Sequence, residues 1–205
     1  LFYIAPAVAD ANIAMINKMS ELGVTGCSLE GVTEAMKSIR TEVRNTGKPI
    51  TYSELRLRGI EAEMKRCLPS TNISNGNSRI VFDAWLEERH ASAERNLLPF
   101  AVEALEEIKS AHPNALIGAV TNGRGNPLDM PNTLAPLFDF CVSGEDEGVF
   151  PNRKPDRGIY EAALARSSIL AGGKGMTSSC WVHVGDDLTN DVGASAACGA
   201  YAVCL

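Results

Sequence analysis

The sequence has 205 residues, of which 45% are hydrophobic and 21% are charged, a balance that is ordinary for a globular protein with its own core. Its formal net charge is −6, which argues against nucleic acid or an anionic membrane as a partner, since both favour a basic protein surface. No stretch is long and apolar enough for a transmembrane helix, and no basic residues precede the short apolar run at residues 1–5, so we expect no membrane span and no signal peptide.

The six cysteines form no C-x-x-C pair, and no histidine lies near them at the spacing of a zinc site. Cys141, Cys180 and Cys204 fall within apolar runs that are typical of buried strands. We therefore expect buried, free thiols in a reducing compartment, in preference to disulfides or metal ligands. This predicts an intracellular protein, located in the cytoplasm, with an organelle as the alternative because a targeting segment could precede this sequence.

The first half of the chain is expected to be helical. Mostly apolar side chains recur at helical spacing over residues 8–22 and again over residues 32–43. Thr51 and Glu54 stand at the spacing of a capping box, which opens a third helical segment that ends near Leu68. We interpret these apolar stripes as core packing.

A polar stretch over residues 70–78 predicts a loop, and a further helix is expected over residues 79–90. Residues 72–74 of this loop fit a glycosylation acceptor pattern, which we interpret as ordinary loop sequence in an intracellular protein. Three arginines in the helical half could reach a substrate, but solvated positions on helix faces are the expectation for each of them. These are Arg44, Arg56 and Arg58.

The second half alternates between helical segments and short, nearly continuous apolar runs. This alternation predicts a buried parallel sheet with helices packed on it. The expected helices cover residues 99–110, 156–166 and 190–198, and the expected strands cover residues 116–120, 138–142, 180–184 and 200–205.

Ligands of parallel α/β sheets bind beyond the carboxyl ends of the strands, so the residues that follow the strands are candidate site residues. Thr121, Asn122 and Gly123 follow the strand at 116–120. The Thr121 hydroxyl and the backbone N–H groups after it could donate hydrogen bonds to a phosphate oxygen. Asn-Gly is also common in turns without any function, which is the alternative interpretation.

Lys154 lies just before the helix that is expected to begin near Asp156. The dipole of a helix disfavours an ammonium group at the N-terminus unless an anion lies between them. Lys154 is therefore a candidate phosphate ligand, and a solvated lysine beside Arg153 is the alternative.

Three carboxylates, those of Asp186, Asp187 and Asp191, follow the very apolar strand at 180–184. Carboxylates this close repel one another unless a cation or a basic group offsets them, and a few hard oxygen ligands suit Mg²⁺. Helix capping is the alternative, with Thr189 or Asn190 as the cap and Asp191 in the first turn, although it explains only one of the three carboxylates. His183, inside the strand, is interpreted as a core histidine.

Together these motifs resemble those of the haloacid dehalogenase superfamily of hydrolases. The resemblance rests on residues 120–123 as the second motif, Lys154 and Pro155 as the third, and residues 183–194 as the fourth. It implies an α/β fold in which a Rossmann-like parallel sheet core, three layers thick (α/β/α), carries an inserted α-helical cap. The implied segments are residues 1–8 as the start of the core, 9–97 as the cap and 98–205 as the core.

The nucleophile of this superfamily is the first Asp of a D-x-D-x-T/S motif at the end of the first core strand, and the sequence contains no such motif. Residues 1–8 resemble the segment that follows this motif, so we expect the sequence to begin just after it. A natural binding or regulatory protein without the nucleophile is the alternative. Because that first strand is central in the sheet of this superfamily, the strands at 116–120 and 180–184 are expected to lack a partner.

The resemblance implies an enzyme, a Mg²⁺-dependent phosphohydrolase that acts on small-molecule phosphate monoesters through an aspartyl-phosphate. It assigns Asp186 as the direct Mg²⁺ ligand, while Asp187 and Asp191 hold metal-bound waters or orient Lys154.

The resemblance also assigns phosphate binding to Thr121, to the backbone N–H groups of Asn122 and Gly123, and to Lys154. Catalysis is assigned to Thr121, Lys154 and Asp186. Dehalogenase and phosphomutase activities are alternatives on the same fold. The 205 residues alone are expected to be inactive, because both acidic residues of the first motif are missing. A monomer or a homodimer is the expected oligomeric state.

Overall fold

The computed structural model describes residues 1–68, 75–173 and 180–205. The acceptor pattern at residues 72–74 lies outside these ranges. No helix within them combines the length and the apolar character that a membrane span needs.

The chain divides into two compact units, Leu1–Glu103 and Ala104–Leu205, which are described separately below. The finer division into a short core start, a cap and a core remains a prediction. Helix α5 (Ala101–Ala111) crosses the boundary between the two units.

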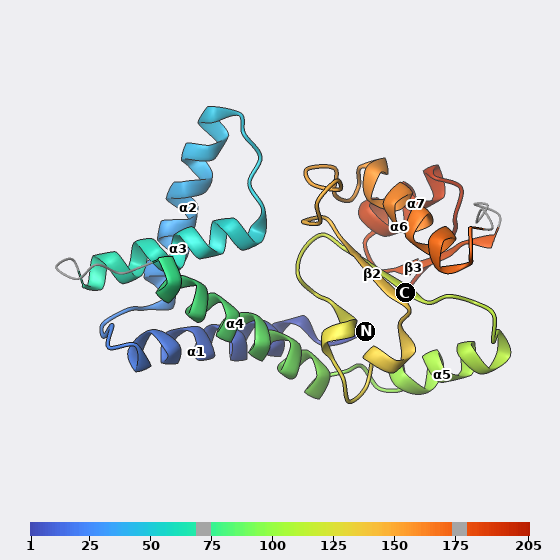
Figure 1. The fold of residues 1–205 in the computed structure, drawn as a ribbon, viewed down its shortest axis with the longest axis horizontal. Coiled ribbons are helices and arrows are strands. Elements are labelled where there is room, and N and C mark those ends of the chain that lie inside the picture. The colour runs from blue at the N-terminus through green and yellow to red at the C-terminus, as the bar shows by residue number, and fades with distance from the viewer. Residues whose placement is uncertain (69–74, 174–179) are drawn as a thin grey trace. The chain divides into compact units, whose positions relative to one another are not determined.

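The first unit is built from long helices, which pack as two pairs (Figure 1). One pair is α1 with α4, and the other is α2 with α3. Next to the start of α1, Phe2 forms an antiparallel bridge with Leu97, which joins the start of the unit to the segment that follows its last long helix. The helices are α1 (Ile4–Glu21), α2 (Leu29–Thr46), α3 (Tyr52–Cys67) and α4 (Asn75–Arg95).

Capping side chains determine where two of these helices begin. Thr51 Oγ1 accepts the Glu54 N–H at 3.0 Å, as expected from the capping-box spacing. Ser28 Oγ accepts the Gly31 N–H at 3.0 Å and caps α2 in the same way. Gly47, with φ of 68°, ends α2 in a left-handed conformation that favours glycine.

The limits predicted for the fourth helix are wrong at both ends. It begins at Asn75, inside the expected polar loop, and it extends past residue 90 to Arg95. The extension is stabilised by packing and by a hydrogen bond, because Ala93 and Ser92 are buried and Ser92 Oγ donates to Asp10 Oδ2 at 2.5 Å. Polar composition alone did not reveal these tertiary contacts.

The apolar stripes of this unit meet in one core, as the helical spacing predicts. Met15, Met19, Ile60 and Met64 are fully buried there, and Trp85 lies at the edge of the cluster. Burying side chains of this size stabilises the unit by about 1.5–3 kcal/mol each.

The second unit is α/β, with short parallel strands and helices packed against them. The strands are β1 (Gly118–Thr121), β2 (Phe140–Ser143), β3 (Val182–Gly185) and β4 (Tyr201–Cys204). The helical elements are α6 (Arg157–Leu170), α7 (Ala194–Ala197), the 3₁₀ turns η1 (Pro127–Asp129) and η2 (Ala135–Leu137), and the π-helix η4 (Leu188–Gly193).

The helix expected at residues 190–198 is only partly correct. The segment begins as the π-helix η4, in which the Val192 N–H bonds to the Asp187 carbonyl at 3.1 Å, and only its last turn is the α-helix α7. Such π-helical turns are frequent at functional sites.

Within the described residues, the strands form two separate parallel pairs and not one continuous sheet. Gly118 pairs with Phe140 at the start of β1–β2, and Val182 pairs with Tyr201 at the start of β3–β4. Strands β1 and β3 do not pair with each other. Each of them therefore has a neighbouring strand on one side only within the described residues, which agrees with the expected loss of a shared partner between them.

Because no described element covers them, several strand side chains that were expected to be buried are exposed. Val182 and Val184 of β3 are 60% and 52% exposed, and Tyr201 of β4 is 66% exposed. The prediction that Cys180 and Cys204 are buried is wrong for the same reason, since both are exposed.

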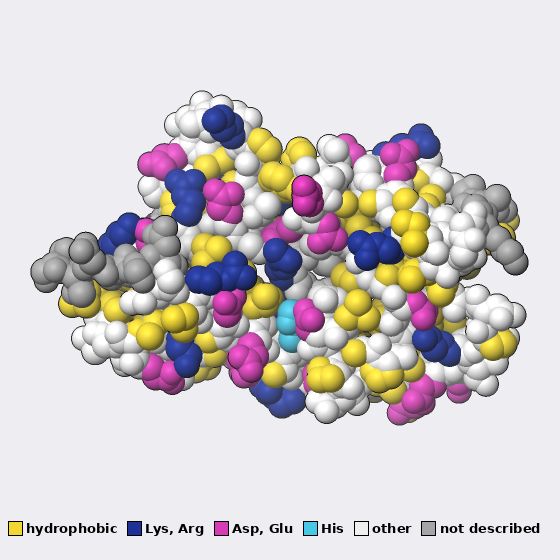
Figure 2. Space-filling view, in the orientation of Figure 1, with side chains coloured by type: hydrophobic (Ala, Val, Ile, Leu, Met, Phe, Trp, Pro, Cys, Tyr) yellow, Lys and Arg dark blue, Asp and Glu magenta, His cyan; other side chains and the backbone are white. Residues whose placement is uncertain are grey.

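The surface carries no extended region of one charge on the face drawn in Figure 2, where acidic and basic side chains are interspersed. Surface ion pairs such as Arg79–Asp83 at 2.9 Å and Arg157–Glu161 at 2.7 Å account for part of this pattern. Exposed pairs of this kind contribute little to stability.

Candidate active site

A buried ion pair joins the third and fourth motifs of the second unit. Lys154 Nζ lies 2.7 Å from Asp191 Oδ1 and donates a second hydrogen bond to the Val120 carbonyl at 3.0 Å. The side chains of Lys154 and Asp191 are only 13% and 10% exposed. Asp191 is therefore the anion that stabilises the Lys154 ammonium close to the start of α6.

The electrostatics of Asp191 follow from this pairing. Burial alone would raise the pKa of its carboxyl, but the hydrogen bond from Lys154 and the charge of that lysine hold the pKa below its ordinary value. The Asp191 side chain is thus an anion at neutral pH. Removing one partner of a buried pair costs about 3–5 kcal/mol, because the other charge is left uncompensated.

His183 is part of the same cluster. It is buried in β3, as expected for a core histidine, and its Nε2 lies 3.6 Å from Asp191 Oδ1. Burial lowers the pKa of His183, and the opposing effect of Asp191 does not cancel it. Its ring also meets the edges of Tyr160 and Trp181, with centroids 5.7 and 5.8 Å away.

Asp187 caps the π-helix η4. Its carboxylate accepts hydrogen bonds from the backbone N–H groups of Thr189 and Asn190, at 2.9 and 2.8 Å, and from the Asn190 side chain at 2.8 Å. The hydrogen bonds from Asn190 are the main cause that lowers the pKa of Asp187. A cap is therefore present, but it is Asp187 and not Thr189 or Asn190, the residues that the capping alternative named.

Asp186 differs from the other two carboxylates. It follows Gly185, the last residue of β3, and its side chain is exposed. No group in the described ranges forms a hydrogen bond or an ion pair with it. Of the three clustered carboxylates, Asp186 alone has no hydrogen-bond or ion-pair partner among the described residues.

The close approach of β3 and η4 requires glycine at position 185. A Cβ atom there would lie 2.4 Å from Asp191 Cβ and 2.6 Å from Asp191 Oδ2. Gly185 thus allows Asp191 to lie against the strand end, where it reaches Lys154.

The second motif is attached to the third by the Asn122 side chain, whose Nδ2 donates to the Lys154 carbonyl at 3.0 Å. Its Oδ1 is buried and has no hydrogen-bond partner in the described structure. The Gly123 N–H points back to Thr121 Oγ1 at 3.3 Å. Thr121, Asn122 and Lys154 therefore lie together at the carboxyl end of β1, as the position of the strands predicts.

Two positioning residues of this site carried no sequence signal. Ser143 Oγ, at the end of β2, donates to the Gly123 carbonyl at 2.8 Å and holds the turn of the second motif. The Tyr160 hydroxyl on α6 donates to the Asn190 carbonyl in η4. Neither residue belongs to a motif, and only the tertiary structure brings them to the site.

The expected arginines have different environments in the first unit. Arg44 is exposed, as expected, whereas Arg58 is half-buried and pairs with Glu42 at 3.5 Å. The solvated position expected for Arg56 is wrong, because its guanidinium stacks 4.1 Å from the ring centroid of Trp85. Burial, and then the charge of Arg89, lower the pKa of Arg56 to about 10.

The donor set beyond β3 fits a hard divalent cation. Mg²⁺ in proteins is commonly bound through one or two carboxylates and keeps several waters. Asp186 supplies one such carboxylate, free of competing partners, and the capped Asp187 adds a second acidic group close by in sequence.

Comparisons with known proteins identify the fold. No protein-family model matches the chain, and no curated protein matches it in sequence. The chain is similar in structure to a 2-haloacid dehalogenase from Pseudomonas syringae pv. Tomato DC3000, with a TM-score of 0.77 and 23% identity, over 100% of this chain and 81% of that one. It is also similar to the putative HAD-hydrolase YfnB from Bacillus subtilis, solved bound to magnesium, with a TM-score of 0.54 and 16% identity, over 95% and 79% of the two chains.

The chain therefore has the fold of the haloacid dehalogenase-like proteins, and the predicted α/β fold class is confirmed. Likeness at these identities establishes the fold, and the chemistry must be argued from the site residues.

Proposed function

We propose that this chain is part of a Mg²⁺-dependent phosphohydrolase of the haloacid dehalogenase superfamily that acts on small-molecule phosphate monoesters. The observation that carries the proposal is the exposed, unpaired carboxylate of Asp186 beside the buried Lys154–Asp191 ion pair. Cation-binding carboxylates and a phosphate-binding lysine are the two charges that phosphoryl transfer requires.

In this proposal Asp186 binds Mg²⁺, which neutralises charge on the transferring phosphoryl group. The capped Asp187 holds water molecules close to the cation, and Asp191 fixes the Lys154 ammonium in place. Lys154 keeps one further N–H donor for a phosphate oxygen, because an ammonium has three and two are in use within the chain.

Phosphate oxygens are then bound by the Thr121 hydroxyl and the Asn122 N–H, and by the Gly123 N–H once phosphate replaces Thr121 Oγ1 as its acceptor. The Asn122 side chain holds this turn against the Lys154 backbone, so the second and third motifs act on the substrate as one unit.

The nucleophile is proposed to be an aspartate of a D-x-D motif on a strand between β1 and β3. This motif is absent from the 205 residues, and the two strands that would flank it do not pair with each other in the described structure. Attack by that aspartate would give an aspartyl-phosphate, and the second Asp of the motif would protonate the leaving group.

Dehalogenation of a 2-haloacid is a second candidate, because the structure with a TM-score of 0.77 is described as a 2-haloacid dehalogenase. That chemistry requires no metal. A free carboxylate at the end of β3 would serve it poorly, so phosphohydrolysis is favoured.

The two candidates are separated by assaying a protein extended upstream to include a D-x-D motif. We expect phosphate release from a panel of phosphate monoesters that requires Mg²⁺ and stops with a chelator. Metal-independent halide release from 2-haloacids, without phosphate release, would contradict the proposal. The 205-residue chain itself is expected to release neither product.

A further inference from the structure

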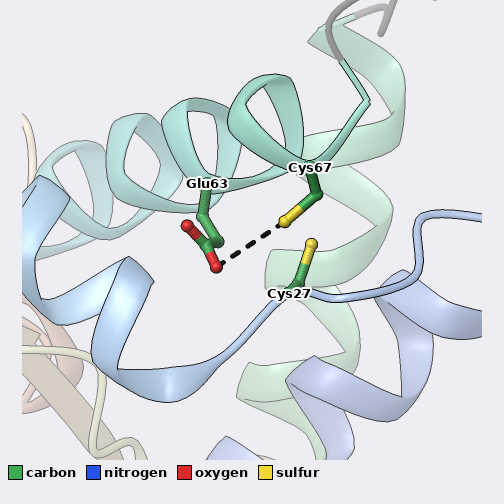
Figure 3. Close-up of side chains that lie close together, drawn as sticks. All are labelled: Cys27, Glu63 and Cys67. Carbon is green, nitrogen blue, oxygen red and sulfur yellow. Dashed lines mark hydrogen bonds between the residues drawn. The ribbon is translucent and has the colours of Figure 1, made fainter.

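A cluster of two thiols and one carboxylate lies in the first unit, whereas the residues assigned to phosphohydrolysis belong to the second unit. Cys27 is on the loop between α1 and α2, Cys67 is the last residue of α3, and Glu63 lies one helical turn before Cys67 (Figure 3). One ligand atom from each residue lies within 4.8 Å of the other two. Both cysteines are partly exposed.

The Glu63 carboxylate of this cluster is buried, and both of its oxygens accept hydrogen bonds. Glu63 accepts the Ser28 N–H at 2.9 Å and two guanidinium N–H groups of Arg66, at 2.7 and 2.8 Å. Its hydrogen bond with Arg66 is the main cause that lowers the pKa of Glu63. Gly31 makes room for this arrangement, since a Cβ atom there would lie 2.2 Å from both carboxylate oxygens.

Arg66 makes the cluster a poor site for a cation. Its Nη2 also donates to Cys67 Sγ at 3.3 Å and to the Gly26 carbonyl at 3.3 Å. A divalent ion held by the two sulfurs and Glu63 would lie beside this guanidinium, where like charges repel. Joining the two thiols covalently places no added charge there.

We propose that Cys27 and Cys67 form a reversible disulfide when the protein meets hydrogen peroxide. The two side chains point toward one another across the gap between the loop and the helix (Figure 3). Closing the bond brings the sulfurs from within 4.8 Å to about 2.05 Å. The ends of two elements can accommodate this movement, because Cys27 follows Gly26, whose φ is 81°, and Cys67 ends its helix.

The positions of the two sulfurs set the order of the reaction. Burial, together with the neighbouring Cys67, raises the pKa of Cys27 to about 12, so Cys27 stays a protonated thiol at neutral pH. Cys67 Sγ donates to Glu63 Oε1 at 3.8 Å and accepts from Arg66 Nη2 at 3.3 Å, so a basic group is in direct contact with this sulfur. Cys67 is therefore the sulfur that meets the peroxide first.

The Cys67 sulfur attacks one peroxide oxygen, the O–O bond breaks, and the released hydroxide takes up the thiol proton as water, which leaves a sulfenic acid. The Cys27 sulfur then attacks the sulfenic sulfur, the S–O bond breaks, and the hydroxide leaves as water with the Cys27 proton. The two sulfurs lose two electrons in total, and these reduce one hydrogen peroxide to two waters.

The test treats the reduced full chain with an equimolar amount of hydrogen peroxide, followed by peptide mapping under non-reducing conditions. We expect the peptides of Cys27 and Cys67 to be joined, four of the six thiols to remain, and dithiothreitol to reverse the change. The disulfide should raise the Tm of the first unit by roughly 10 °C.

Cys27→Ser and Cys67→Ser should each abolish the cross-link, and the matched double variant Cys180→Ser/Cys204→Ser, which removes two exposed thiols of the second unit, should keep it. The wild-type peptide map stands even where a variant fails to fold. A cross-link between other cysteines, or no loss of the Cys27 and Cys67 thiols, would overturn the proposal. So would stoichiometric Zn²⁺ binding to the reduced chain that protects both thiols from alkylation and is lost in Glu63→Gln.

Discussion

At the end of β3, three aspartates within six residues have three different environments. Asp187 is a helix cap, Asp191 is a buried partner of Lys154, and Asp186 is exposed and has no partner among the residues that the structure describes. Mutual repulsion among three carboxylates, the basis for expecting a cation, is therefore already relieved at two of them. The metal assignment depends on Asp186.

His183 gives this site a defined response to pH. Its pKa in the folded protein lies below the ordinary value of 6.5, so the unfolded chain binds the proton more readily than the folded one. The contribution of neutral His183 to stability is fully present above pH 6.5 and is lost as the pH falls below it. We expect the urea concentration at the unfolding midpoint of the second unit to be lower at pH 5.5 than at pH 7.5.

Trp181 fluorescence in a Trp85→Phe background measures this midpoint, because Trp181 packs against His183. His183→Phe should flatten the dependence between pH 7.5 and 5.5, whereas His112→Gln, at an exposed histidine, should leave it unchanged. An equal slope in wild type and His183→Phe would show that His183 does not carry the effect.

At the scale of elements, the π-helix η4 is what brings the fourth motif to the third. Asp187 caps its start, Tyr160 bonds to the Asn190 carbonyl within it, and Asp191 faces β3. Asp191 can take this position only if the last residue of β3 has no side chain, and Gly185 meets that requirement.

Gly185→Ala is expected to lower the free energy of unfolding of the second unit by about 1–3 kcal/mol, because the added Cβ overlaps Asp191 and displaces it from Lys154. Urea unfolding measures the change. Gly125→Ala is the matched control, since the nearest atom to its added Cβ is Thr121 Oγ1 at 3.8 Å. Equal losses in the two variants would contradict the close packing of η4 on β3.

The sequence predicted those elements whose signal is local. Helical spacing and the cap at Thr51 located the helices of the first unit, and apolar runs located the strands. The start of α4, the π-helical turn and the positions of Ser143 and Tyr160 depend on contacts distant in sequence, which no local pattern encodes. The Cys27–Cys67 cluster was missed for the same reason, because the loop and the helix end meet only in the folded unit.

At the scale of the molecule, the fold and the chemistry rest on different observations. The haloacid dehalogenase-like fold follows from structural likeness over the whole chain, while the reaction class rests on a few side chains at two strand ends. The unpaired edges of β1 and β3 link the fold to the reaction class. A strand that paired with both edges would end near Asp186 and Lys154.

Asp186→Ala tests this account most directly, in the protein extended to include a D-x-D motif. Mg²⁺-dependent phosphate release should fall by more than about 100-fold, because the cation loses its direct ligand. Asp83→Ala, at an exposed carboxylate of α4, should retain wild-type turnover. Unchanged turnover with unchanged Mg²⁺ dependence in Asp186→Ala would contradict the assignment of the acidic turn as the metal site.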